Sequence, residues 1–335
     1  MKSILLTTSA LVAFAGAAAA DGHTSVKFSG EASAEVNDVT GYATDADITA
    51  TMAAKLDNGL RATAVINFNP STGATNEVSV GSIKLAGKDA SVTFGTGLDG
   101  AVFSTVGDDY DIGQAAEEST DGIVGAFTVA GASVAVSMPV AAGADIDTDT
   151  VEIGVSTDLS GWAVALGLVG GEYAATAAGT VAGADLNFGM ASNDEWDAGV
   201  SYGLGAVTLS ASTDEAEAWT VGADYAAGDY TAGVEYNADE SWEVSAGYAA
   251  GAIAVAASLD SADVTTLGAT YDLGNGMTAG AGVAGDDSFA YVDYDLGGGA
   301  SAFASYTDAA AKLVKAGPAE RDVTAGTTVG VSFGF

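Results

Sequence analysis

The residues that could support chemistry in this chain are mainly carboxylates. The 335 residues include 45 Asp and Glu against 9 Lys and Arg, no cysteine, and a single histidine, His23. A Ser-His-Asp triad could be built only on His23, near the start of the chain, and the composition does not supply the side chains of a zinc site or a disulfide framework. We therefore expect the protein not to be an enzyme. Its carboxylates can attract cations, repel anions and hold divalent ions loosely.

Many of these carboxylates fall in the longest segment without strand-like alternation, between a predicted strand at 91–96 and another that starts near Gly122. The acids of this segment are Asp99, Asp108, Asp109, Asp111, Glu117 and Glu118. A further cluster, Asp145, Asp147 and Asp149, has the spacing of the start of a calcium loop but lacks the glycine of its sixth position. We expect no cofactor and no defined metal site, although the acidic connectors could bind Ca²⁺ loosely.

The N-terminus predicts export. Residues 1–20 combine Lys2, an apolar run and the small residues Ala18, Ala19 and Ala20, which is the pattern of a secretory signal peptide. Residues 21–335 contain no run of about 18 apolar residues, so no transmembrane helix is expected. The formal net charge of −36 makes nucleic acid and anionic membrane surfaces poor partners. Because 48% of the residues are hydrophobic, disorder is not expected either.

Aromatic residues reveal a 23-residue repeat. Tryptophan recurs at this interval at Trp196, Trp219 and Trp242, and tyrosine at Tyr202, Tyr225, Tyr248, Tyr271 and Tyr294. Each tyrosine precedes a glycine turn, and acidic connectors separate the units. Between these landmarks apolar and polar residues alternate, which predicts strands. Ten turn signals, near residues 58, 87, 130, 160, 183, 204, 227, 250, 274 and 297, predict an all-β antiparallel array.

The apolar face of these strands could point to a soluble core or to lipid. The polar face is mostly small, and the tryptophans and tyrosines lie at opposite ends of the apolar face. Two such aromatic girdles are typical of a transmembrane β-barrel, with lipid outside and water inside. The apolar alternation of Val329, Val331, Phe333 and Phe335 predicts a last strand that pairs with the first, near residues 26–36, and closes the barrel.

The chain resembles the general porins of alphaproteobacteria. The signal peptide and the segments 127–138 (FTVAGASVAVSM), 294–301 (YDLGGGAS) and 331–335 (VSFGF) carry the resemblance. It implies an outer-membrane barrel of 16 strands, a homotrimer, and a third loop, here 97–122, that folds into the lumen. It also implies that the outer-membrane assembly machinery reads the terminal aromatic, here Phe335 after Phe333. The turn count instead allows 18 to 22 strands.

The resemblance turns the six acids of the 97–122 segment into candidates for a pore constriction. Lys27, Lys55 and Arg61 fall on the predicted lumen face opposite them. Acids facing bases would place a transverse field across the channel, and the excess of acids predicts cation preference. The alternatives are an ordinary solvated surface loop and lumen-facing basic residues that only balance local acids.

The predicted function is therefore passive diffusion of small hydrophilic solutes and ions through a water-filled outer-membrane porin. The alternative is an acidic secreted surface protein, such as an adhesin or S-layer-like β-protein without transport activity. An outer-membrane enzyme such as a lipase is disfavoured because His23 is the only histidine.

Overall fold

The computed structural model describes residues 24–69, 77–106, 120–140, 150–308, 313–314, 321–322 and 325–335. The predicted signal peptide lies outside this part. The chain divides into two compact units, the first of residues 1–29, 47–69 and 76–198 and the second of residues 30–46, 70–75 and 199–335. Within the described residues, no helix is long and apolar enough to cross a membrane.

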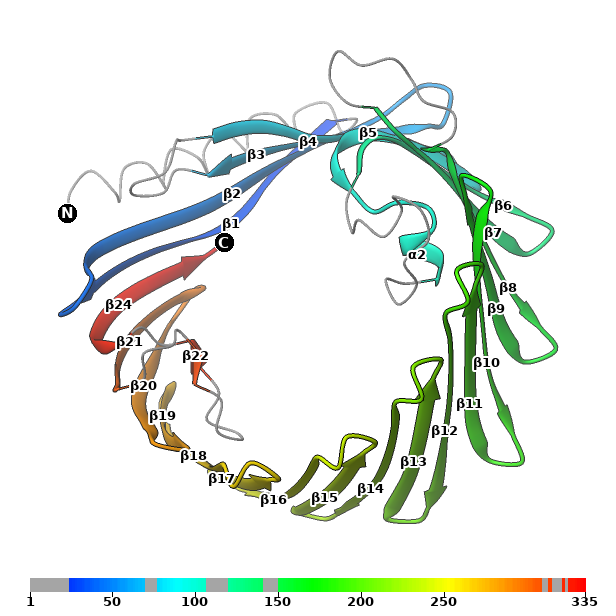
Figure 1. Cartoon of the computed structure of the whole chain (residues 1–335). Helices are drawn as coiled ribbons and strands as arrows, with labels where there is room; N and C mark the ends of the chain where they lie inside the picture. Colours follow the sequence, from blue (N-terminus) through cyan, green and yellow to red (C-terminus); the bar gives the residue numbers. More distant parts are fainter. Residues whose placement is uncertain are drawn as a thin grey trace. The chain divides into compact units, whose positions relative to one another are not determined.

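The first unit contains nine complete strands and one short helix (Figure 1). In chain order these elements are β3 (Arg61–Asn69), β4 (Glu77–Ala86), β5 (Ala90–Leu98), α2 (Phe103–Val106), β6 (Thr120–Val129), β7 (Ala132–Pro139), β8 (Glu152–Leu159), β9 (Trp162–Val169), β10 (Glu172–Val181) and β11 (Ala184–Ala191). Three strands contribute residues to both units, namely β1 (Thr24–Asn37), β2 (Gly41–Lys55) and β12 (Trp196–Leu204).

The second unit continues the same pattern of hairpins. Its strands are β13 (Val207–Asp214), β14 (Trp219–Ala227), β15 (Tyr230–Asn237), β16 (Trp242–Ala250), β17 (Ile253–Asp260), β18 (Thr265–Gly274), β19 (Met277–Ala284), β20 (Asp287–Gly297), β21 (Ala300–Thr307), β22 (Leu313–Val314), β23 (Arg321–Asp322) and β24 (Gly326–Gly334). The two-residue strands β22 and β23 pair only with each other. In Figure 1, β22 lies beside β20, with which it is in contact.

Within the described residues, 22 strands form one antiparallel sheet, so the expected number of 16 is wrong. The count of turn signals, which allowed up to 22 strands, agrees with the structure. All ten predicted turns join two strands of a hairpin, and β1 and β24 complete the set. The segment 172–182, which the sequence leaves open as a weak strand or a loop, forms strand β10 and pairs with both β9 and β11.

The first and last strands pair as predicted. The register runs from Glu31 opposite Gly334 to Asn37 opposite Thr328. The Asn37 side-chain amide donates to Thr328 Oγ1 at 2.8 Å and to the Ala325 carbonyl at 3.1 Å, which fixes this register. Because β1 and β24 are paired, neither is left as a free edge, which is the strand connectivity of a closed barrel.

The tight turns explain why so many short hairpins form. Ser160 and Gly161 both have positive φ, 58° and 88°, the backbone of a type I′ turn. The Gly161 N–H donates to the Asp158 carboxylate at 3.0 Å. Such a turn needs only two residues, so a strand of eight residues can return at once.

Strand β9 shows which face of the sheet is which. Leu166 and Leu168 on one face are 37% and 38% exposed, whereas Ala165, Gly167 and Val169 on the other face are buried beneath α2. We call the face that carries α2 the small-residue face. Large apolar side chains therefore lie on the uncovered face, the reverse of a soluble sheet and the arrangement expected for contact with lipid.

Candidate functional site

We call Leu98–Val106 the inward segment; it begins at the last residue of β5 and packs against the small-residue face. Of the six predicted constriction acids, Asp99 belongs to this segment and is exposed. The other five, Asp108, Asp109, Asp111, Glu117 and Glu118, lie outside the described residues, so their role stays a prediction. The structure does show how the first part of the predicted loop, up to Val106, is held against the neighbouring strands.

A buried carboxylate holds the start of this segment. Glu152, at the first position of β8, is 4% exposed, and its Oε2 accepts hydrogen bonds from the Val102 N–H at 3.0 Å and from the Ser137 hydroxyl at 2.7 Å. The Ser137 hydroxyl in turn accepts one from the Ala101 N–H at 2.7 Å. These three bonds satisfy two backbone donors that would otherwise be buried without partners.

Glycines on the strands below allow α2 to approach closely. A Cβ at position 154 would overlap the Ala101 carbonyl oxygen and Thr105 Oγ1. A Cβ at position 167 would lie 2.8 Å from Val102 Cγ1, a distance that real Cβ atoms essentially never show. Backbone contact of this kind requires residues without a side chain.

Apolar contacts complete the docking. Val102 and Val106 of the inward segment join four buried residues of the strands in one cluster, namely Ala165, Val169, Ala174 and Ala191. Sequence reasoning missed the whole docking site, including Glu152, Ser137, Gly154 and Gly167. The sequence does contain a signal for this site. Glu152, Gly154 and Gly167 lie on one face of two neighbouring predicted strands, where an acid and two glycines stand among small residues.

Basic side chains form a second feature of the first unit. Lys55 on β2 lies directly opposite Arg61 on β3. Lys84 on β4 lies opposite Thr63, two residues from Arg61 and therefore on the same face. Lys27, on β1, is exposed and alternates with Val26 and Phe28. The predicted cations Lys55 and Arg61 are thus brought together, and Lys84 is an addition that the cross-strand register reveals.

The second unit carries carboxylates on neighbouring strands instead. Glu235 on β15 lies directly opposite Glu243 on β16. With Asp224 on β14 they line a polar cavity of about 270 Å³ between β13 and β16. The Asn237 amide donates to Glu235 Oε1 at 3.2 Å. Like charges placed directly opposite each other repel, so this arrangement favours a bound or passing cation.

No metal site is evident in the part of the chain that the structure describes, since it holds no group of three His, Cys, Asp or Glu arranged for one. The calcium-like residues Asp145, Asp147 and Asp149 lie outside the described residues. Loose Ca²⁺ binding therefore stays a prediction.

The predicted interface aromatics lie in two rows. Trp196, Trp219 and Trp242 are the first residues of β12, β14 and β16, and the five tyrosines of the repeat lie near the glycine turns at the other end. Cross-strand contacts extend the rows, with ring centroids 5.7 Å apart for Trp219 and Tyr236 and 5.0 Å apart for Tyr230 and Tyr248. Phe333 and Phe335 are 46% and 47% exposed at the end of the chain.

The chain shows low similarity to several solved structures of bacterial porins and outer-membrane proteins. The chain is similar to OmpT of Vibrio cholerae, in-vitro folded and in trimer form, with 11% identity and a TM-score of 0.34 over 93% of this chain and 100% of that one. An anion-selective porin from Comamonas acidovorans shows 14% identity and a TM-score of 0.34 over 93% and 100%. A mutant of the Rh. blastica porin shows 14% identity and a TM-score of 0.29 over 92% and 100%.

No curated protein matches the sequence. The family comparison is decisive, because the model of the Gram-negative porins matches residues 7–288, most of the chain. This match gives no support to the reading as a surface-layer protein or adhesin. The chain belongs to the Gram-negative porin family.

Proposed function

We propose that this porin forms a water-filled, cation-preferring channel through which small hydrophilic solutes and ions diffuse across the outer membrane. The observation that carries the proposal is the carboxylate group Asp224, Glu235 and Glu243 on β14–β16. The sequence has no lysine or arginine between residues 89 and 311, so no base from these strands neutralises them. Charged groups lining a pore bias which ions pass.

The inward segment supplies the narrowing in this proposal. Glu152 and the glycine contacts hold Leu98–Val106 against β8 and β9, and the acids that follow it in sequence would stand opposite Lys55, Arg61 and Lys84. Such an arrangement would give the channel a transverse field at its narrowest part. In this proposal Lys27 is a further positive charge of the same wall.

Three further parts of the proposal rest on the pattern of the N-terminus and on the family, the first on the pattern and the other two on the family. Residues 1–20 direct export, the terminal Phe335 is read by the assembly machinery, and the protein assembles as a homotrimer in the lipid bilayer. Cross-linking of detergent-extracted protein tests the last part. Trimers are expected, and monomers alone at high protein concentration would contradict it.

The test of cation preference is the reversal potential in a KCl gradient across a planar bilayer. We expect Glu235→Gln with Glu243→Gln to shift the reversal potential toward zero, since two lining charges are removed. The matched control is Glu217→Gln with Glu240→Gln, which removes the same charge from exposed connector positions. If both double variants shift the potential equally, the carboxylate group on β14–β16 does not set selectivity.

A further inference from the structure

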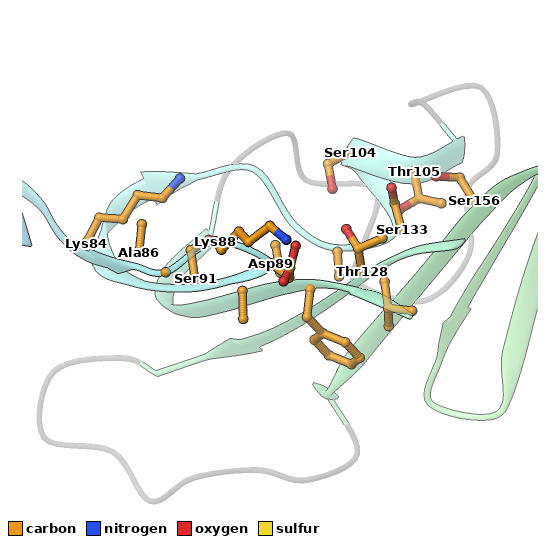
Figure 2. Close-up of a pocket in the computed structure, with 16 residues that line it drawn as sticks. Lys84, Ala86, Lys88, Asp89, Ser91, Ser104, Thr105, Thr128, Ser133 and Ser156 are labelled. Carbon is orange, nitrogen blue, oxygen red and sulfur yellow. The ribbon is translucent and has the colours of Figure 1, made fainter. Parts of the chain in front are cut away.

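One cavity of the first unit is lined by lysines. Its volume is about 420 Å³, and it lies between α2 and the hairpins formed by β4–β7 (Figure 2). This size is within the range of small-molecule sites, roughly 300–1,000 Å³. Lys84 on β4 and Lys88 in the following turn line the cavity, together with Asp89. Two ammonium groups and one carboxylate give it a formal charge of +1 in a chain whose net charge is −36.

Hydroxyl groups make up much of the remaining lining. Thr128 on β6 lies opposite Ser133 on β7, and Ser133 lies opposite Ser156 on β8, so one row crosses three strands. Ser91 of β5 lines the same cavity, as does Ser104 of α2 (Figure 2).

These polar groups keep unused hydrogen-bonding capacity within the part of the chain that the structure describes. Within the described residues, the side chains of Ser91, Thr128, Ser133 and Ser156 have no hydrogen-bond partner, and those of Lys84 and Lys88 have neither a hydrogen bond nor an ion pair. Ammonium groups donate strongly to carboxylate oxygens, and hydroxyls both donate and accept. The lining therefore matches a molecule that has one negative end and several hydroxyls.

We propose that this cavity is a binding subsite for a small hydroxylated monoanion, a sugar acid of the gluconate class. Lys84 and Lys88 bind the carboxylate, and the serine and threonine hydroxyls bind the hydroxylated carbons. Asp89 accepts a solute hydroxyl and repels a second negative charge, which disfavours dianions. The subsite would retain one kind of anion in a channel whose carboxylates otherwise exclude anions.

The proposal concerns binding and does not depend on cation preference, so it is tested in detergent by calorimetric titration of folded protein at low ionic strength. We expect saturable binding of gluconate, weaker binding of the dianion glucarate, and no measurable binding of neutral glucose. Lys84→Gln with Lys88→Gln should raise the Kd for gluconate about tenfold or more, as expected for the loss of a charge-assisted hydrogen bond. Asp89→Asn should tighten gluconate binding and reduce the discrimination against glucarate.

Lys27→Gln is the control, because it removes one positive charge from a residue that does not line the cavity. Its Kd for gluconate should equal that of the wild type. Absence of saturable gluconate binding by folded wild-type protein would overturn the proposal. Equal binding of glucose, or an unchanged Kd in the double lysine variant, would also overturn it. Circular dichroism shows separately whether each variant folds. If the double lysine variant does not fold, the single variant Lys88→Gln, in an exposed turn, takes its place.

Discussion

Glu152 is the residue on which the position of the inward segment depends most directly. Replacing it by alanine would leave the Val102 N–H and the Ser137 hydroxyl without an acceptor, at a cost of about 1–3 kcal/mol. We expect Glu152→Ala to release the segment and to increase single-channel conductance. Glu152→Gln keeps an acceptor oxygen and should change conductance much less.

Glu172→Ala is the control for this prediction. Glu172 and Glu152 lie on the same face of the sheet, because both are paired with Val169 of β9. Unlike Glu152, Glu172 is exposed, and within the described residues it forms no hydrogen bond to α2. Equal conductance in the Glu152→Ala, Glu172→Ala and wild-type channels would show that Glu152 does not hold the constriction.

Removing a charge from the pair Glu235 and Glu243 should stabilise the protein, whereas removing Glu152 should destabilise it. Because these carboxylates lie directly opposite each other, removing one charge should relieve repulsion. We expect Glu235→Gln to stabilise the folded protein slightly, by about 0.2–1 kcal/mol. Urea unfolding at neutral pH and low salt measures this change, and a clear loss of stability would indicate that a bound cation already offsets the repulsion.

At the scale of the element, the contact between α2 and the strands beneath it is the feature most sensitive to size. Gly154→Ala would place a methyl group against the Ala101 carbonyl and Thr105, so we expect the segment to shift and conductance to change. The control is Gly203→Ala on β12, where an added Cβ would meet nothing within 4 Å. An unchanged conductance in Gly154→Ala would contradict the docking geometry.

The elements differ in how far the sequence alone could define them. Hairpins such as β8–β9 were predictable because alternation and a turn of two residues, Ser160 and Gly161, are local signals. The docking of α2 was not, because Glu152 and Val102 are far apart in sequence and nothing local marks their hydrogen bond. The expected number of 16 strands is wrong because it rests on resemblance, whereas the local turn signals allow the 22 strands that the described residues form in one sheet.

At the scale of the whole molecule, the acidic charge predicts a pH dependence. Asp308 follows β21 and accepts hydrogen bonds from the Ser288 backbone N–H and hydroxyl, which lower the pKa of its carboxyl. In the β15–β16 connector, the Ser241 hydroxyl and N–H likewise lower the pKa of Asp239. A lowered pKa means that these carboxylates keep their charge at a pH below the usual range, and that the stability they contribute is lost only as pH falls through the folded pKa.

Because protonation removes the charge of a carboxylate, we expect cation preference to decline as pH falls through the range in which carboxyl groups protonate. Reversal potentials measured in a fixed KCl gradient over a series of pH values check this. If cation preference stays the same at a pH low enough to protonate all the carboxyl groups, the acids do not control which ions pass.

Whether the protein is an open, cation-preferring channel is tested most directly by the single-channel current of refolded residues 21–335 in a planar bilayer under a KCl gradient. We expect stepwise conductance with a reversal potential on the cation-selective side. Stepwise conductance with an anion-selective potential would contradict the role given to the carboxylates. No conductance at all from protein with the β-sheet spectrum of the folded state would contradict the open channel itself.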